Sequence, residues 1–288
     1  EISHDEKNKI VNYKNALLKI YDVPVLYFPK FFHPDPSVER QSGFLQPRIN
    51  NSNILSSSFN VPYFHVISEN KDLTFTPTLF DNDIYMVQNE FRVKNKKSSF
   101  ISDLGFTKGY KSIVTDNKKK NIGHLFAKLD LDLNFESFIK SDLNLSLEQV
   151  TNDTYLKVFE TNLVNTSPKI LPKNKGQLTS AIKINLDHEK YALDAGMTAY
   201  ETLEGSDSDR FQYRLPYYSF SRKLISNEIL SLDFQSNGNN SYQNTNNIKS
   251  EVTNNFDFKS LDFFSENGFK NNLGVYFKNV NTVGKNDV

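Results

Sequence analysis

Cysteine and tryptophan are absent from this chain of 288 residues, and neither sign of charge prevails, because 34 Lys and Arg stand against 34 Asp and Glu. The missing cysteines exclude disulfides, cysteine-ligated zinc and thiol nucleophiles. The balanced charge argues against a nucleic-acid-binding protein, whose mark is an excess of Lys and Arg. No apolar run reaches the roughly 18 to 20 residues of a membrane-spanning helix, which excludes a helical membrane protein.

Apolar residues are also scarce, at 38% of the chain, against about 45–50% in a typical soluble domain. A transmembrane β-barrel needs apolar residues only at every second strand position, so a low average does not exclude it. Phe (24), Tyr (14) and above all Asn (35) are abundant. The aromatic residues fit the girdles that flank the apolar band of such barrels, and the Asn residues fit turns.

Alternation of apolar and polar residues is the main local pattern. In the run 125–135 the odd positions are apolar, while Lys128, Asp130 and Asp132 occupy even positions. This period of two predicts a strand with one apolar and one charged face. The pattern returns near 143–148, 182–186, 191–199, 230–234 and 273–277. Periodicity alone does not determine whether the apolar or the charged face of these strands is exposed to water.

Strand length favours the barrel. Runs of this kind exceed the usual strand length of about 5–6 residues and match strands that cross a bilayer at a tilt. Helix and strand do not alternate, which argues against a parallel sheet. One short helix is expected at 153–159, capped by Asp153. The sequence therefore predicts an all-β fold, an antiparallel outer-membrane β-barrel present in part.

The sequence contains no recognisable catalytic or metal-binding motif. The five histidines, at 4, 33, 65, 124 and 188, have no zinc-site spacing. No nucleophile elbow, phosphate-binding loop or dinucleotide fingerprint occurs. Asp130 and Asp132 share a strand face, and a solvated lumen wall explains them better than a glycosidase pair. We expect a protein that is not an enzyme, with no catalytic residue, metal or cofactor.

The most specific segment is 23–47, VPVLYFPKFFHPDPSVERQSGFLQP. It resembles the junction between the periplasmic domain and the barrel in the LPS-assembly protein family LptD, also called the organic-solvent-tolerance family. The resemblance continues collinearly through VPYF at 61–64, DLTFTP at 72–77, NEFR at 89–92, DTYL at 153–156 and RLP at 214–216.

The resemblance implies a division of the chain. Residues 1–28 would be the last strands of a periplasmic β-jelly-roll, 29–42 a Pro-rich hinge, and 43–288 the first, incomplete part of a transmembrane barrel. We therefore expect a piece of a longer protein. Family members use disulfides to tie the two domains together, and this chain departs from them in having no cysteine.

The resemblance also implies a function. Family members insert lipopolysaccharide (LPS) into the outer leaflet of the Gram-negative outer membrane through a lateral gate. Their partners are LPS, the LptE lipoprotein in the lumen, the periplasmic LptA bridge and outer-membrane lipids. The N-terminal part would lie in the periplasm.

Three sets of site residues follow from the resemblance. Pro47 and Pro62 match prolines of the family in the first two barrel strands. They would weaken strand pairing at the gate, because proline donates no ladder hydrogen bond, although proline also simply protects strand edges. The hinge would contain Pro29, Pro34, Pro36 and Gly43. The possible lipid path, or equally an end cap of the jelly roll, would consist of Val25, Leu26, Tyr27, Phe28, Phe31 and Phe32.

The alternative functions are another outer-membrane barrel, a porin or receptor, and a soluble glycan-binding β-sandwich.

Overall fold

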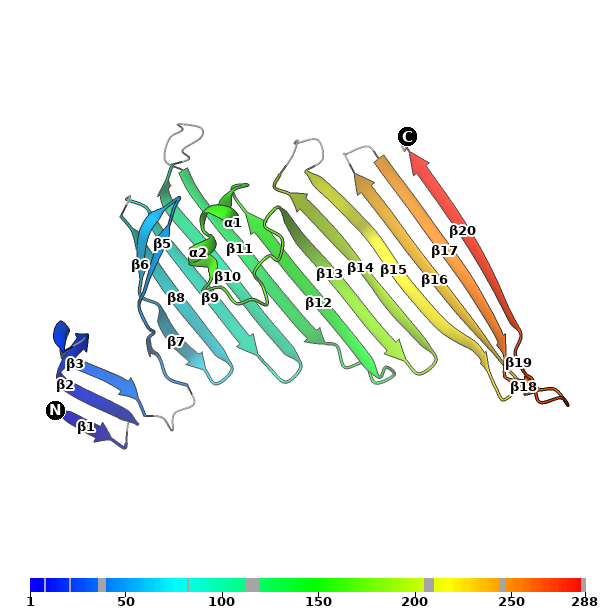
Figure 1. Cartoon of the computed structure of the whole chain (residues 1–288), viewed down its shortest axis with the longest axis horizontal. Coiled ribbons are helices and arrows are strands. Elements are labelled where there is room, and N and C mark those ends of the chain that lie inside the picture. Colours follow the sequence, from blue (N-terminus) through cyan, green and yellow to red (C-terminus); the bar gives the residue numbers. More distant parts are fainter. Residues whose placement is uncertain are drawn as a thin grey trace.

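The computed structural model of the chain describes residues 1–7, 9–20, 22–35, 40–81, 83–111, 120–204, 210–243 and 247–285. Antiparallel strands dominate it, in a three-stranded sheet, a long sheet and a two-stranded hairpin (Figure 1). The predicted all-β antiparallel class is confirmed. The strands are β1 (Ile2–Asp5), β2 (Ile10–Ile20), β3 (Val23–Pro34), β4 (Gly43–Phe44), β5 (Arg48–Ser52), β6 (Ser56–Asn60), β7 (Tyr63–Ser68), β8 (Lys71–Phe80), β9 (Tyr85–Lys94), β10 (Ser98–Tyr110), β11 (Lys120–Asp132), β12 (Lys140–Val150), β13 (Gln177–His188), β14 (Tyr191–Thr202), β15 (Phe211–Ser226), β16 (Leu230–Gln243), β17 (Asn247–Ser260), β18 (Phe263–Phe264), β19 (Lys270–Asn271) and β20 (Gly274–Lys285); the helices are α1 (Tyr155–Val158) and α2 (Glu160–Leu163).

The three-stranded sheet has the order β1-β2-β3. The Pro-rich segment expected to form the hinge begins at Pro29, but β3 continues to Pro34, which pairs with Ile10. The strand tolerates its prolines because β3 is an edge strand, where a missing N–H need not interrupt a second ladder. Of the predicted hinge residues, Pro29 and Pro34 thus lie in β3, and Pro36 lies outside the described residues.

The long sheet is a meander in which chain neighbours pair antiparallel. Its order is β5-β6-β8-β9-β10-β11-β12-β13-β14-β15-β16-β17-β20, with β7 beside β8 and β4 beside β7. From β8 onward its strands have 10 to 16 residues, so the predicted strand length is confirmed. In the described part of the chain β5 and β20 are the outermost strands and the sheet stays open.

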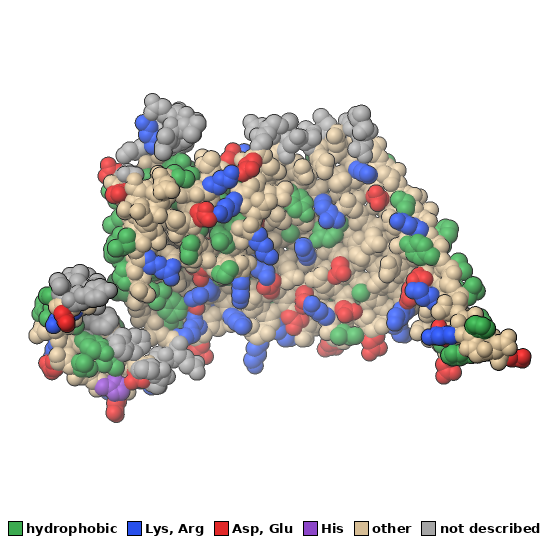
Figure 2. Space-filling view, viewed as in Figure 1, with side chains coloured by type: hydrophobic (Ala, Val, Ile, Leu, Met, Phe, Trp, Pro, Cys, Tyr) green, Lys and Arg blue, Asp and Glu red, His purple; other side chains and the backbone are tan. Residues whose placement is uncertain are grey.

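The two faces of the long sheet differ in polarity, and the structure settles which one is covered. We call the face that carries α1 and α2 the inner face; Figure 2 looks onto it and shows Lys, Arg, Asp and Glu scattered there. Asp103 and Thr107 on this face are buried, whereas Leu104 and Phe106 on the outer face are 53% and 52% exposed. A water-soluble sheet would bury the apolar set, so this arrangement favours a barrel over a soluble β-sandwich.

The inner face also accounts for part of the asparagine excess. On β16 and β17, Gln235 lies opposite Asn255, Asn237 opposite Thr253 and Asn239 opposite Glu251. Alternation places all of these side chains on the inner face. Amide side chains give this wall hydrogen-bonding capacity without net charge, so Asn here is a strand residue as well as a turn residue.

The lower end of the long sheet, at the bottom of Figure 1, is the end nearest the three-stranded sheet. Tight connections lie there, such as 69–70 between β7 and β8 and 189–190 between β13 and β14. The longest described connection, 151–176, leaves β12 at the upper end. Short turns on the periplasmic side and longer loops outside are typical of outer-membrane barrels.

Candidate functional site

The first hairpin of the long sheet is interrupted in both strands at the same level. β4 and β5 are separated by residues 45–47, and β6 and β7 by residues 61–62. Across the break a single backbone hydrogen bond joins the Leu45 N–H to the Pro62 carbonyl, at 2.8 Å. Pro47 and Pro62 stand in the two breaks. Neither can donate to the ladder.

The two halves of this interrupted hairpin are paired unequally. The upper half pairs along the whole of β5, from Arg48 opposite Asn60 to Ser52 opposite Ser56. The lower half pairs only through Gly43 and Phe44. The sequence placed Pro47 and Pro62 within the first two barrel strands; the structure places them between the halves of those strands. Their role in a gate stays a prediction.

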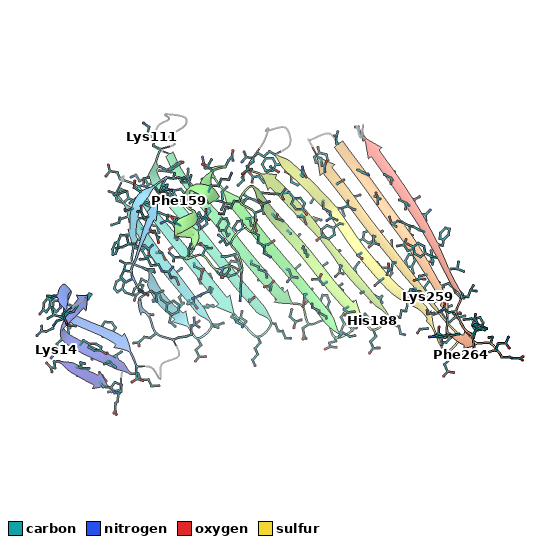
Figure 3. The ribbon with its side chains drawn as sticks, viewed as in Figure 1. Lys14, Lys111, Phe159, His188, Lys259 and Phe264 are labelled. Carbon is teal, nitrogen blue, oxygen red and sulfur yellow. The ribbon has the colours of Figure 1, made fainter. Side chains whose placement is uncertain are left out.

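The loop 151–176 folds back onto the inner face in front of β9 to β11, and its α2 lies beside β5 in the upper half of the interrupted hairpin (Figures 1 and 3). Phe159, which belongs to this loop, is fully buried. Its ring centroid lies 6.2 Å from that of Phe80, 5.9 Å from that of Tyr110 and 4.8 Å from that of Tyr155. Buried rings at these separations pack favourably beyond the area they remove from water. This cluster is the main core of the described chain.

The helix predicted at 153–159 is found as two single turns, α1 and α2. Thr154, not Asp153, is the N-cap of α1, and no side chain caps it. Asp153 instead accepts hydrogen bonds from Arg210, at 2.7 Å for the shorter one. In the described ranges no helix is long and apolar enough to cross a membrane.

Polar contacts tie the loop to the first hairpin. The Asn162 side-chain amide donates to Ser58 Oγ on β6, at 3.2 Å, and Arg48 on β5 donates to Asn165. Leu55, in the turn between β5 and β6, belongs to the buried cluster under the loop. The upper half of the hairpin is therefore held from inside as well as through its ladder.

A buried polar group lies beneath the loop. His124 Nδ1 is 2.8 Å from the Tyr155 hydroxyl, and its Nε2 is 3.4 Å from Asp103 Oδ2, which also accepts a hydrogen bond from Thr166. Burial raises the pKa of Tyr155, so its hydroxyl stays protonated. Which of the two groups donates in the hydrogen bond between this hydroxyl and Nδ1 depends on the tautomer of the His124 ring. A Cβ on Gly105 would lie 2.2 Å from the His124 ring, so the ring needs glycine opposite it.

An arginine cluster holds the lower half. Asp72 on β8 accepts hydrogen bonds from Arg40, which lies just before β4, and from Arg92 Nε at 2.6 Å. Both guanidinium groups lie over the Phe64 ring of β7. Glu90 accepts from the Ser167 backbone N–H at 2.9 Å. The segment that enters the sheet is thus fixed to β8 and β9 beside the break.

The other predicted site residues are placed as follows. Gly43 lies in β4, where its backbone is not left-handed and a Cβ would meet open space, so the fold itself does not require glycine there. In β3, Tyr27 and Phe28 point to opposite faces by alternation, and Phe32 shares the face of Phe28; these three side chains are exposed. The side chains of Val25, Leu26 and Phe31 lie outside the description.

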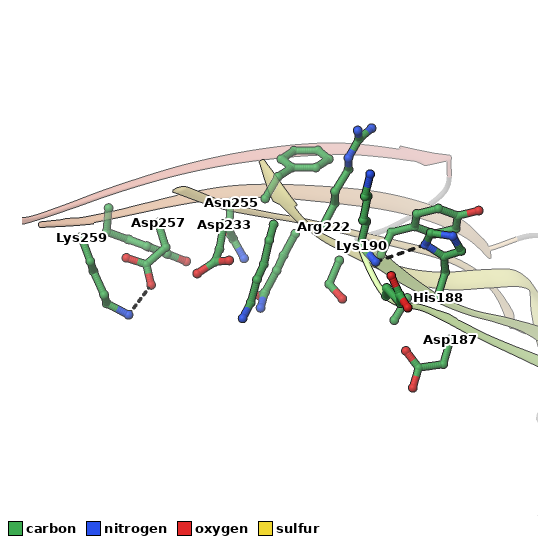
Figure 4. A pocket seen from close by; sticks show the side chains of 16 residues that line it. Asp187, His188, Lys190, Arg222, Asp233, Asn255, Asp257 and Lys259 are labelled. Atoms are coloured by element: carbon green, nitrogen blue, oxygen red, sulfur yellow. Dashed lines mark hydrogen bonds and ion pairs between the residues drawn. The ribbon is translucent and has the colours of Figure 1, made fainter. Parts of the chain in front are cut away.

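A second groove lies far from the first hairpin, on the lower part of β13 to β17 and β20 (Figure 4). Asp233 and Asp257 face each other across β16 and β17, and Lys259 Nζ lies 2.7 Å from Asp257 Oδ2. Opposed like charges destabilise a sheet pair, which Lys259 offsets. Among the residues that the structure describes, no cluster of three or more His, Asp or Glu is arranged to hold a metal ion.

Long antiparallel strands in a meander, with a polar covered face and an apolar exposed face, define the class of outer-membrane β-barrels, here a part of one. No family model matches the chain. It is 30% identical over 175 residues to the LPS-assembly protein LptD of Legionella pneumophila (strain Paris), a match that covers 58% of this chain and 21% of that protein. LptD of Idiomarina loihiensis is 25% identical over 205 residues, which are 70% of this chain and 24% of that protein.

A shorter match, to LptD of Nitrosomonas eutropha, is 34% identical over 92 residues, which are 32% of this chain and 13% of that protein. These comparisons confirm the resemblance predicted from the sequence: the chain is similar to a segment of LPS-assembly protein LptD. It spans about a fifth of the length of the Legionella and Idiomarina relatives.

Proposed function

We propose that this chain is part of an outer-membrane protein that inserts LPS into the outer leaflet, and that its interrupted hairpin forms one side of the lateral gate. The observation that carries the proposal is the pair of facing breaks at Pro47 and Pro62, in a chain similar to LptD. No catalytic step is involved, because the lipid is moved and not altered.

The unequal pairing of the two halves suggests where such a gate parts. A backbone hydrogen bond contributes about 0.5–1.5 kcal/mol net, and the lower half has few of them. The upper half keeps its ladder and is held by the loop 151–176. The lower half, at the periplasmic end, has the shorter ladder and is held mainly by the ion pairs of Arg40 and Arg92 with Asp72, so it would separate first.

The N-terminal segments have matching proposed roles. Residues 1–28 would end the periplasmic jelly roll, residues 29–42 would join it to the barrel, and residues 43–288 would form its first strands. The exposed edges of the three-stranded sheet suit pairing with strands of a periplasmic bridge such as LptA. Tyr27, Phe28 and Phe32 would contact acyl chains, and the polar inner face would contact LptE. The protein would lie in the Gram-negative outer membrane with its N-terminal part in the periplasm.

Replacing Pro47 and Pro62 together with Ala in the full-length protein tests the gate. Alanine restores two N–H donors, so each strand can pair across its break and closing gains about 1–3 kcal/mol. We expect LPS delivery to the cell surface to slow by about fivefold or more, since 1.4 kcal/mol is a factor of ten. The control is Pro77→Ala in β8, a strand without a break. Unchanged delivery by a folded double variant would show that the prolines do not form the gate.

A further inference from the structure

The hairpin of β18 and β19 extends from the lower end of the sheet, between β17 and β20 (Figure 1). It carries large apolar side chains that no described residue covers: Phe264 is 70% and Phe269 68% exposed, and Leu261, Phe263 and Leu273 are also exposed. Figure 3 marks Phe264 at this tip. Such a concentration of exposed aromatic side chains marks an interaction surface.

The hairpin is held in a defined shape. Asp262 forms an ion pair with Lys270 at 2.6 Å and accepts a hydrogen bond from Asn272. The turn is closed by the Ser265 N–H, which donates to the Phe269 carbonyl, at 2.9 Å. The Asp262 carboxylate, the Lys270 ammonium and these backbone groups of the turn are therefore paired within the hairpin. The apolar side chains are left to meet the surroundings.

The distribution of these side chains indicates the kind of surroundings. Phe263 and Phe264 are neighbours in one strand and so point to opposite faces of the ribbon. A protein partner that docks on a two-stranded ribbon covers one face. Apolar side chains on both faces, with polar groups paired internally, fit insertion into an apolar medium.

An aromatic row on the outer face leads to the hairpin. It consists of one residue on each of β14, β15, β16, β17 and β20, namely Tyr191, Phe220, Phe234, Phe256 and Phe277. Successive ring centroids are 6.1, 6.2, 4.8 and 6.3 Å apart. Aromatic rows of this kind lie at the membrane interface in outer-membrane barrels. From Phe277, Val275 and then Leu273 continue the apolar surface to the hairpin.

We propose that the β18–β19 hairpin inserts into the phospholipid leaflet at the lower end of the sheet, with Phe263, Phe264 and Phe269 at the boundary of headgroups and acyl chains. The inference rests on the proposed function in one respect, that the outer face of the long sheet contacts lipid. The hairpin extends that contact below the strands and fixes the depth of β17 and β20 in the membrane.

Tryptophan fluorescence tests this directly, because the chain contains no tryptophan. Phe264→Trp, Phe234→Trp and Gln235→Trp are made in the full-length protein, with any Trp elsewhere replaced by Phe. Each variant is folded into phosphatidylethanolamine–phosphatidylglycerol vesicles, with or without bromine on the acyl chains near the headgroups. Position 234 reports on the aromatic row, and 235, the next residue, on the inner face.

We expect brominated lipid to quench Phe264→Trp and Phe234→Trp by about twofold or more, as for side chains at the interfacial boundary, and to leave Gln235→Trp unchanged. If Phe234→Trp is quenched and Phe264→Trp is not, the hairpin does not enter the membrane, although the outer face does. If neither is quenched, the lipid-facing assignment of the sheet fails as well.

Discussion

Phe159→Ala is expected to destabilise the folded protein by about 3–5 kcal/mol, the usual cost of removing a buried phenyl group. The ring is fully buried and contacts Phe80, Tyr110 and Tyr155. These contacts attach the loop 151–176 to β8 and β10. Their loss also loosens the inner support of the first hairpin. The free energy of unfolding, measured by denaturant titration of the full-length protein in lipid vesicles, checks the effect.

The matched control is Val164→Ala in the same loop. Val164 is 69% exposed, and a substitution at such a position changes stability by no more than about 0.5 kcal/mol. If Phe159→Ala and Val164→Ala lower the free energy of unfolding by the same small amount, the loop 151–176 is not packed on the inner face.

Asp103→Ala is expected to cost about 3 kcal/mol or more, because it leaves the buried Thr166 hydroxyl without its acceptor and removes the carboxylate that lies 3.4 Å from His124 Nε2. Asp103→Asn keeps the size and one acceptor oxygen, so we expect an intermediate loss. The same titration in vesicles measures both variants.

The control for Asp103 is Asp130→Ala, which removes a partly exposed carboxylate from the same face of the neighbouring strand β11. Asp130 and Lys128 are each more than a third exposed, and such pairs contribute about 0–1 kcal/mol. If Asp103→Ala and Asp130→Ala lower the free energy of unfolding by the same amount, Asp103 does not stabilise the buried polar group beneath the loop 151–176.

Alternation predicted the long strands well because a strand's period is local. The run 125–135 contains most of β11, and Lys128 and Asp130 share a face as predicted. Which face is covered could not be read from the run. That depends on the loop 151–176, whose contact between Asn162 and Ser58 joins residues 104 positions apart.

His124 shows the limit at the site. Strand alternation predicts that His124 lies on the same face as Lys128 and Asp130, since all three have even numbers. Its spacing to the other histidines indicates no functional site. Its burial requires Tyr155 from the loop and the small Gly105 opposite its ring. Neither contact has a sequence signal, because both depend on how distant segments pack.

Pro47 and Pro62 were recognised through the resemblance, but the relation between them was not visible in the sequence. Their two breaks face each other only because the turn after β5 sets the register, with Ser52 opposite Ser56. A register shifted by one residue would place Val61 and not Pro62 at the hydrogen bond to Leu45.

The most direct test of the central claim is capture of LPS at the break. A photoreactive phenylalanine analogue replaces Leu45, which lines the inner-face groove beside Pro62, and in a second variant Gln235, on the inner face of a distant strand. In living cells that express the full-length protein, illumination is expected to yield an LPS adduct at position 45 and little at 235. A folded, membrane-inserted protein that gives no LPS adduct at position 45 would contradict the assignment of the interrupted hairpin as the exit for LPS.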